Sequence, residues 1–99
     1  MNELVLLAGA EADMIELYVR YDALSPSYAE RYYAALGQAL DLLVRFPEIG
    51  PRYHSHFRRL VIQRFSLGVF YSIEGRRIAV GAILDLRQSP EAIMRRLGK

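Results

Sequence analysis

Arginine is the residue type in this sequence best suited to bind an anionic partner. It supplies twelve of the thirteen basic residues, and the notable positions are Arg58-Arg59, Arg64, Arg76-Arg77 and Arg87. A planar guanidinium binds carboxylate or phosphate through two parallel hydrogen bonds, which lysine cannot do. In a strand Arg58 and Arg59 point to opposite faces, and Arg58 shares its parity with Arg64. Because an antiparallel sheet can leave one face open, these arginines predict a partner-binding surface.

The other residues that could bind a metal or act in catalysis do not form a complete site. His54 and His56 could face the same side of a strand, but two ligands do not close a metal site. Ser55 lies between them without a nucleophile-elbow motif or an identifiable buried acid. The sequence has no cysteine, which excludes disulfides and thiolate chemistry. We therefore predict no catalytic residue, no metal and no cofactor.

Charge is divided unevenly along the chain. Residues 1–51 carry three basic and eight acidic groups, whereas residues 52–99 carry ten basic and three acidic groups. The basic half indicates an anionic partner, either nucleic acid or an acidic peptide. The alternative is that acidic helices simply face a basic sheet, and charge alone leaves both interpretations open.

Length and composition favour one globular domain over residues 1–99, with 53% hydrophobic residues and a net charge of +2. No apolar run approaches the roughly 20 residues of a membrane span, and the N-terminus lacks the basic start of a signal peptide. We therefore expect a cytoplasmic protein with no membrane partner.

Periodicity and turn residues divide the chain into seven elements. Helical spacing places Met14, Leu17, Tyr18 and Tyr21 on one stripe, and Ser25-Pro26 and Ser89-Pro90 are typical of helix starts. The pattern predicts strands at 3–8, 57–64, 65–73 and 78–85, and helices at 10–23, 26–45 and 90–97. Gly9 is expected to close the first strand, Glu11 and Asp13 to lie in the first turn of the helix that follows, and Phe46 to share the apolar face of the second helix. Residues 47–51 are predicted as a loop, and Tyr53 and the two histidines are also expected in a loop. Alternation places Phe65, Leu67, Val69, Tyr71 and Ile73 on one face of their strand, and Ile78, Val80, Ala82 and Leu84 on one face of the next. The order β-α-α-β-β-β-α indicates an α+β domain, with a helical hairpin packed on a mainly antiparallel, twisted sheet.

An ordered set of short stretches then resembles a known family, the RelE/ParE superfamily of bacterial type II toxins, and is closer to its ParE branch. The matching stretches cover nearly the whole chain: Ala12-Asp13-Met14 with Tyr18, Tyr28–Phe46, Pro47–Gly50, Phe57–Ile62, Phe65–Tyr71 and Ile83–Pro90. The resemblance implies a β-α-α-β-β-β core with a helical hairpin.

The two branches imply different activities. RelE-type members are mRNA endonucleases that act on the ribosome, and their basic and tyrosine positions fall here at Gly68 and Gln88-Ser89-Pro90, with only Arg87 matching. Members of the ParE type are poisons of DNA gyrase and need no nuclease site. The resemblance to that type implies a gyrase-poisoning toxin that is not an enzyme, with Arg87, Arg95 and Arg96 near the target. It also implies a cognate antitoxin with an acidic tail that folds on binding. The alternatives are a RelE-type nuclease and a degenerate, non-toxic binding domain.

Overall fold

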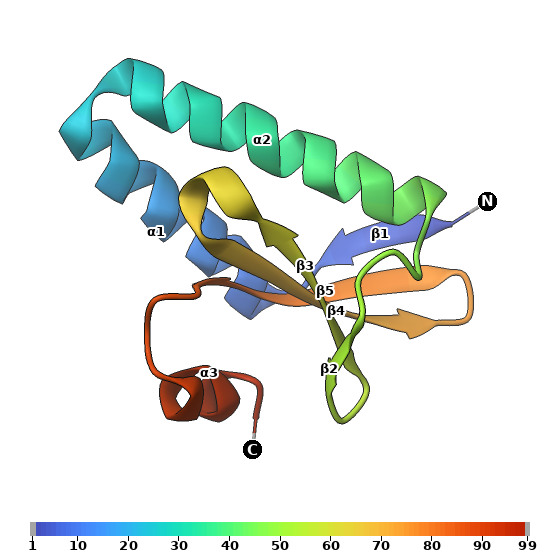
Figure 1. Cartoon of the computed structure of the whole chain (residues 1–99). Helices are drawn as coiled ribbons and strands as arrows, with labels where there is room; N and C mark the ends of the chain where they lie inside the picture. Colours follow the sequence, from blue (N-terminus) through green and yellow to red (C-terminus); the bar gives the residue numbers. More distant parts are fainter. Residues whose placement is uncertain (1, 99) are drawn as a thin grey trace.

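The computed structural model describes residues 2–98 and contains three helices and a mixed five-stranded sheet within them (Figure 1). The helices are α1 (Ala8–Leu24), α2 (Pro26–Arg45) and α3 (Pro90–Arg96). The strands are β1 (Glu3–Leu6), β2 (Arg52–His54), β3 (Phe57–Ile62), β4 (Leu67–Glu74) and β5 (Arg77–Asp85). Their spatial order is β1-β5-β4-β3-β2, with β1 parallel to β5 and the other pairs antiparallel. The predicted α+β class is confirmed.

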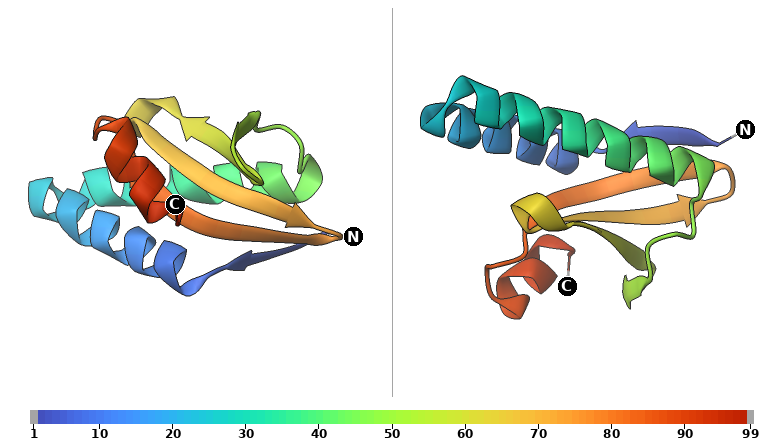
Figure 2. Two further views of the ribbon diagram at one scale, coloured as in Figure 1. Left: turned by 90° about the horizontal axis from the view of Figure 1, so that it is seen from below. Right: turned by 45° about the horizontal axis from the view of Figure 1, so that its top comes forward.

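Helices α1 and α2 form the predicted hairpin and cover one face of the sheet (Figures 1 and 2). Ser25 caps α2 by accepting a 3.1 Å hydrogen bond from the N–H of Tyr28, and Pro26 takes the first helical position. Leu36 and Leu43 of α2 are fully buried between the hairpin and the strands. The buried residues between the hairpin and the sheet, which we call the hairpin-side cluster, are therefore the main core of the molecule.

The observed ends of the two hairpin helices differ from the predicted ones. Helix α1 begins at Ala8, so Gly9 lies inside the helix instead of closing the strand. Of the two acids expected in its first turn only Glu11 is there, and Asp13 is buried further along. Phe46, expected on the buried face of α2, is the residue after the helix and is 56% exposed.

A bulge in β5 changes which residues share a face. Phe70 pairs with Ala82 and Tyr71 pairs with Val80, so Gly81 is the extra residue. Val80 and Ile83 consequently both face the hairpin, whereas Ala82 and Leu84 face the other side. The predicted common face of Ile78, Val80, Ala82 and Leu84 is wrong for this reason, although β5 does lie inside the sheet.

Two local features differ from the predicted strand pattern. The segment predicted as a loop contains β2, which pairs with the start of β3. The strand predicted to reach Arg64 ends at Ile62, because Gln63–Phe65 forms a turn of 3-10 helix and Ser66 takes a left-handed conformation with φ 51°. This turn cancels the expected shared parity of Arg58 and Arg64.

The face of the sheet opposite the hairpin is not open. Phe70, Ala82 and Leu84 form a second cluster there with Ile93 of α3, and all four are buried. The short C-terminal helix therefore covers part of the face that was predicted to present arginines, as Figure 2 shows. Among residues 2–98, every helix is too short or insufficiently apolar to cross a bilayer.

Candidate functional site

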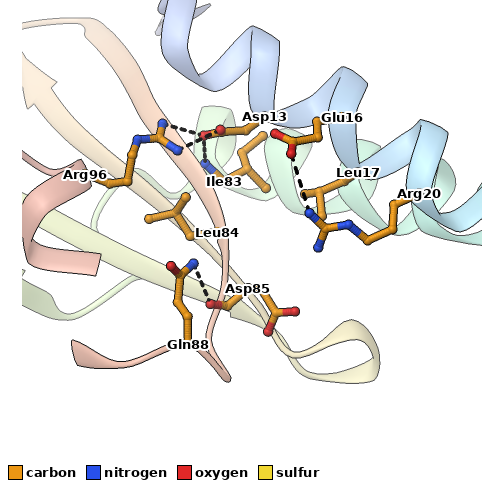
Figure 3. Close-up of a pocket in the computed structure, with 9 residues that line it drawn as sticks. All are labelled: Asp13, Glu16, Leu17, Arg20, Ile83, Leu84, Asp85, Gln88 and Arg96. Atoms are coloured by element: carbon orange, nitrogen blue, oxygen red, sulfur yellow. Dashed lines mark hydrogen bonds and ion pairs between the residues drawn. The ribbon is translucent and has the colours of Figure 1, made fainter. Parts of the chain in front are cut away.

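A buried carboxylate joins α1, β5 and the C-terminal helix (Figure 3). Asp13 is only 7% exposed. Its Oδ1 and Oδ2 accept hydrogen bonds of 2.9 and 2.8 Å from the two Nη atoms of Arg96, and Oδ2 also accepts the N–H of Ile83 at 3.0 Å. These hydrogen bonds raise the pKa of the Arg96 guanidinium. Strand β1 pairs with β5 only as far as Val80 and does not reach Ile83. The Asp13 carboxylate therefore accepts the N–H of Ile83 in place of β1.

A trough of about 300 Å³ lies beside this ion pair. In Figure 3 its walls are α1, the end of β5 and the segment leading to α3. The lining is ionic, with Asp13, Glu16, Arg20, Asp85 and Arg96, and its remaining residues are Leu17, Ile83, Leu84 and Gln88. Glu16 and Arg20 lie 3.6 Å apart, and Gln88 Nε2 donates to the Asp85 carbonyl oxygen at 3.0 Å.

Arg87 is fixed in an outward position just after β5. Its Nε and Nη2 donate to the two carboxylate oxygens of Asp85 at 3.0 and 2.9 Å, and its backbone N–H donates to Oδ1 at 2.8 Å. Arg87 therefore holds the pKa of the Asp85 carboxyl below its usual range. The Arg87 side chain remains 70% exposed, so the turn presents a preoriented guanidinium to solvent.

Arg58 holds a loop in place. Its Nη1 donates to the Gly50 carbonyl oxygen at 2.8 Å. The Tyr71 hydroxyl donates to the Pro47 carbonyl at 2.7 Å and accepts the N–H of Gly50 at 3.0 Å. A Cβ at Gly50 would lie 2.8 Å from both the Arg59 carbonyl oxygen and the Tyr71 hydroxyl, so only glycine fits without movement. Burial raises the pKa of Tyr71.

The remaining predicted arginines lie apart from one another. Arg59 lies over the ring of Tyr53, 4.9 Å from its centroid. Arg64 lies 5.9 Å from the ring centroid of Phe65, which packs on the tyrosines of the hairpin. Arg95 is exposed in the last turn of α3. The six predicted target-binding arginines thus occupy several regions of the surface instead of one patch.

Positions that would carry nuclease chemistry have structural tasks here. Gly68 is buried in β4, and a Cβ there would lie 2.8 Å from Leu86 Cδ2 and 2.9 Å from Phe70 Cε1. Ser89 caps α3, since its hydroxyl accepts the N–H of Ala92 at 3.1 Å. Gln88 bonds the end of β5. An arginine or tyrosine side chain for RNA cleavage is therefore absent from these positions.

The histidines lie on β2 and at the tip that follows it. His54 is half-buried, and His56 is exposed with its Nδ1 3.3 Å from the Ser55 hydroxyl. Within the described part of the chain, no group of three histidine, aspartate or glutamate residues could hold a metal ion. Lys99, which the sequence counts toward the basic half, lies outside the described residues.

Sequence reasoning missed Asp13 as the residue that organises this region. The available signal was its position between Ala10 and Leu17, at a spacing that places a charge on the buried face of α1. A buried carboxylate needs a partner. The partner, Arg96, lies 83 residues further along the chain, which no local pattern could indicate.

This chain is similar to one protein-family model and to a solved structure. The family model described as the ParE toxin of type II toxin-antitoxin system, parDE, matches residues 4–90. A solved structure, the chromosomal ParDE TA system from P. aeruginosa, has the same fold with a TM-score of 0.78 and 21% identity, covering 88% of this chain and 98% of that one. No curated protein sequence matches significantly. Because the family match spans most of the sequence, the resemblance is confirmed, and the chain belongs to the ParE toxin family of type II toxin–antitoxin systems.

Proposed function

We propose that this toxin arrests growth in the cytoplasm by poisoning DNA gyrase and that it does not cleave RNA. The observation that supports the proposal is the use of Gly68 and Ser89 for packing and capping, so that neither position carries a side chain able to activate a 2′-hydroxyl. A toxin without a reactive site acts by binding. The exposed, preoriented Arg87 is the target contact that we favour, together with Arg95 on α3.

The test compares two targets in purified systems. The full chain should inhibit DNA supercoiling by gyrase and trap cleaved DNA, while mRNA in translating ribosomes stays intact. Codon-specific cleavage of ribosome-bound mRNA with normal supercoiling would establish the nuclease alternative. Normal growth on induced expression, with antitoxin binding retained, would establish a non-toxic binding domain.

Arg87→Ala tests the proposed contact. We expect the variant to lose most of its growth arrest and to stay folded, because removal of an exposed side chain changes stability by about 0.5 kcal/mol or less. Arg31→Ala, an exposed arginine on α2, is the matched control and should arrest growth like the parent. Equal growth arrest by Arg87→Ala and the parent would remove Arg87 from the target surface.

We further propose that the antitoxin binds two chemically different regions. An apolar groove of about 350 Å³ on the hairpin is lined by Met14, Ile15, Tyr18, Val19 and Tyr33. Ile15 and Val19 are 56% and 63% exposed, which suits the apolar side of an amphipathic helix. Exposed acids outnumber arginines on the hairpin, so the acidic tail fits the basic surfaces of the other half of the chain.

A synthetic antitoxin segment can separate the two regions by calorimetry. Val19→Ser should weaken binding of the segment equally at low and high salt, because it removes apolar contact. Arg87→Ala and Arg64→Ala should weaken binding mainly at low salt. Unchanged affinity in all three variants would show that the antitoxin binds elsewhere.

A further inference from the structure

The segment Arg52–Arg59, which we call the arm, carries basic residues with no acid among them. It contains three arginines and two histidines and no acid within eight residues, whereas the whole chain has a net charge of only +2. Within the part of the chain that the structure describes, no carboxylate forms an ion pair with an arginine of the arm. Since Arg58 is engaged with the Gly50 carbonyl oxygen, Arg52 and Arg59 are the charges of the arm that are available to a partner.

The arm is an antiparallel β-hairpin at the edge of the sheet, made of β2 and the start of β3, and its residues Arg58 and Arg59 also pair with β4. Arg52 lies opposite Arg58 and His54 lies opposite Phe57, and the chain reverses at Ser55, which has φ 55°. Like charges directly opposite on paired strands destabilise the pairing. A ribbon that keeps two arginines opposite each other without an intervening acid loses stability, and contact with a polyanion would offset that loss.

Aromatic side chains fasten the arm to the sheet. The ring of Tyr53 packs edge-on against Phe70 at a centroid distance of 5.2 Å, and Phe57 lies against Gly81, where an added Cβ would come within 3.2 Å of Cε1. Arg59 lies over Tyr53, so the ring holds the plane of the guanidinium and its N–H edges can still donate outward. Arg52 and His56 are exposed. Tyr53 and Phe57 thus hold the arm against the sheet, and the Arg52 guanidinium is exposed on its free side.

We propose that the arm binds duplex DNA by placing its free end, from Arg52 to Phe57, in the major groove, with Arg52 and Arg59 on the phosphates. The groove is about 12 Å wide and admits a two-stranded β-ribbon. In Figure 1 and in the right view of Figure 2 the arm extends from the sheet on the side away from the hairpin. A projecting ribbon needs a concave partner, which a DNA groove provides. An extended acidic peptide is the other polyanion, but it binds best in a groove of the protein.

The test measures binding of the full chain to a fluorescein-labelled 20-base-pair duplex by anisotropy, between 25 and 200 mM salt. Each phosphate contact contributes about 0.9 to the slope of log affinity against log salt. The double variant Arg52→Gln with Arg59→Gln should bind at least tenfold more weakly at low salt, with a slope smaller by about two. Arg52→Gln alone, at an exposed position, should lower the slope by about one. This single variant still tests the proposal if the double variant does not fold.

The matched control changes the same net charge on the opposite side of the molecule. Arg31→Gln with Arg45→Gln removes two exposed arginines of α2 and should bind DNA within twofold of the parent. Equal losses in the control and the arm variant, or no loss in either, would overturn the proposal.

A competitor identifies the class of polyanion. Polyglutamate with the same number of charges should displace the duplex poorly, because it lacks a groove. Displacement at equal charge concentration would overturn the proposal in favour of an acidic protein segment. The measurement uses DNA alone, so a failure of gyrase poisoning leaves its outcome unaffected.

Discussion

Removal of the Asp13 carboxylate should destabilise the fold more than any other single change at a charged residue on the α1 helix. The side chain of Asp13 is 9% exposed and that of its partner Arg96 is 41% exposed. In Asp13→Ala the N–H of Ile83 loses its acceptor, which costs about 1–3 kcal/mol. Arg96 can turn toward water, so the full loss of about 3–5 kcal/mol for a broken buried pair does not apply. We expect a total of about 2–4 kcal/mol.

Asp13→Asn separates the two contributions. The amide oxygen of asparagine can still accept the N–H of Ile83, while the charge that binds Arg96 is gone. The free energy of unfolding should therefore fall by only about 1–2 kcal/mol. The difference between the two variants measures the hydrogen bond to Ile83.

Urea denaturation followed by circular dichroism measures both values. With a slope of about 1.5 kcal/mol per molar urea, Asp13→Ala should lower the midpoint by about 2 M. Hydrogen exchange at the amide of Ile83 should accelerate in Asp13→Ala more than in Asp13→Asn. A change below about 0.5 kcal/mol in Asp13→Ala would refute the reasoning, because surface substitutions alone give that value.

Three further predictions concern the hairpin-side core and its tyrosines. Leu36→Ala, at a site 1% exposed, should lower the free energy of unfolding by about 2–5 kcal/mol in urea titrations. Tyr71→Phe leaves the buried N–H of Gly50 unbonded and should cost about 1–3 kcal/mol in thermal unfolding. Burial raises the pKa of Tyr21, Tyr32 and Tyr71, so the unfolded chain releases these protons near pH 10 while the folded chain keeps them. Their contribution to the free energy of unfolding should therefore be fully present below that pH and decrease above it. Tyrosinate absorbance should appear together with the loss of ellipticity. Ionisation of all seven tyrosines in a folded protein would contradict this prediction.

Local signals predicted the hairpin and most of the sheet. Ser25-Pro26 and Ser89-Pro90 place the starts of α2 and α3 correctly, because a cap and a proline act within one helical turn. The alternation of β4 also holds, since Leu67, Val69 and Tyr71 all face the hairpin. These features depend on neighbouring residues alone, which is why a single sequence reveals them.

The features that the sequence did not reveal depend on pairing between distant residues. The bulge at Gly81 exists because β4 and β5 must both fill two faces, and it moves Ile83 to the hairpin side. Strand β2 forms only against β3 and has no apolar alternation of its own. The local pattern predicts Asp13 as an acid of the first helical turn, because its partner Arg96 lies 83 residues away in the sequence.

The two faces of the sheet differ in how extensively they are packed. On the hairpin side, large side chains of two helices interlock with the strands, so a truncation there should reduce folding and activity together. On the other side a four-residue cluster and one ion pair hold a seven-residue helix. A helix with so few buried contacts opens locally at a lower free energy than the core. Variants that lose growth arrest but stay folded should therefore concentrate around α3, Arg87 and the arm.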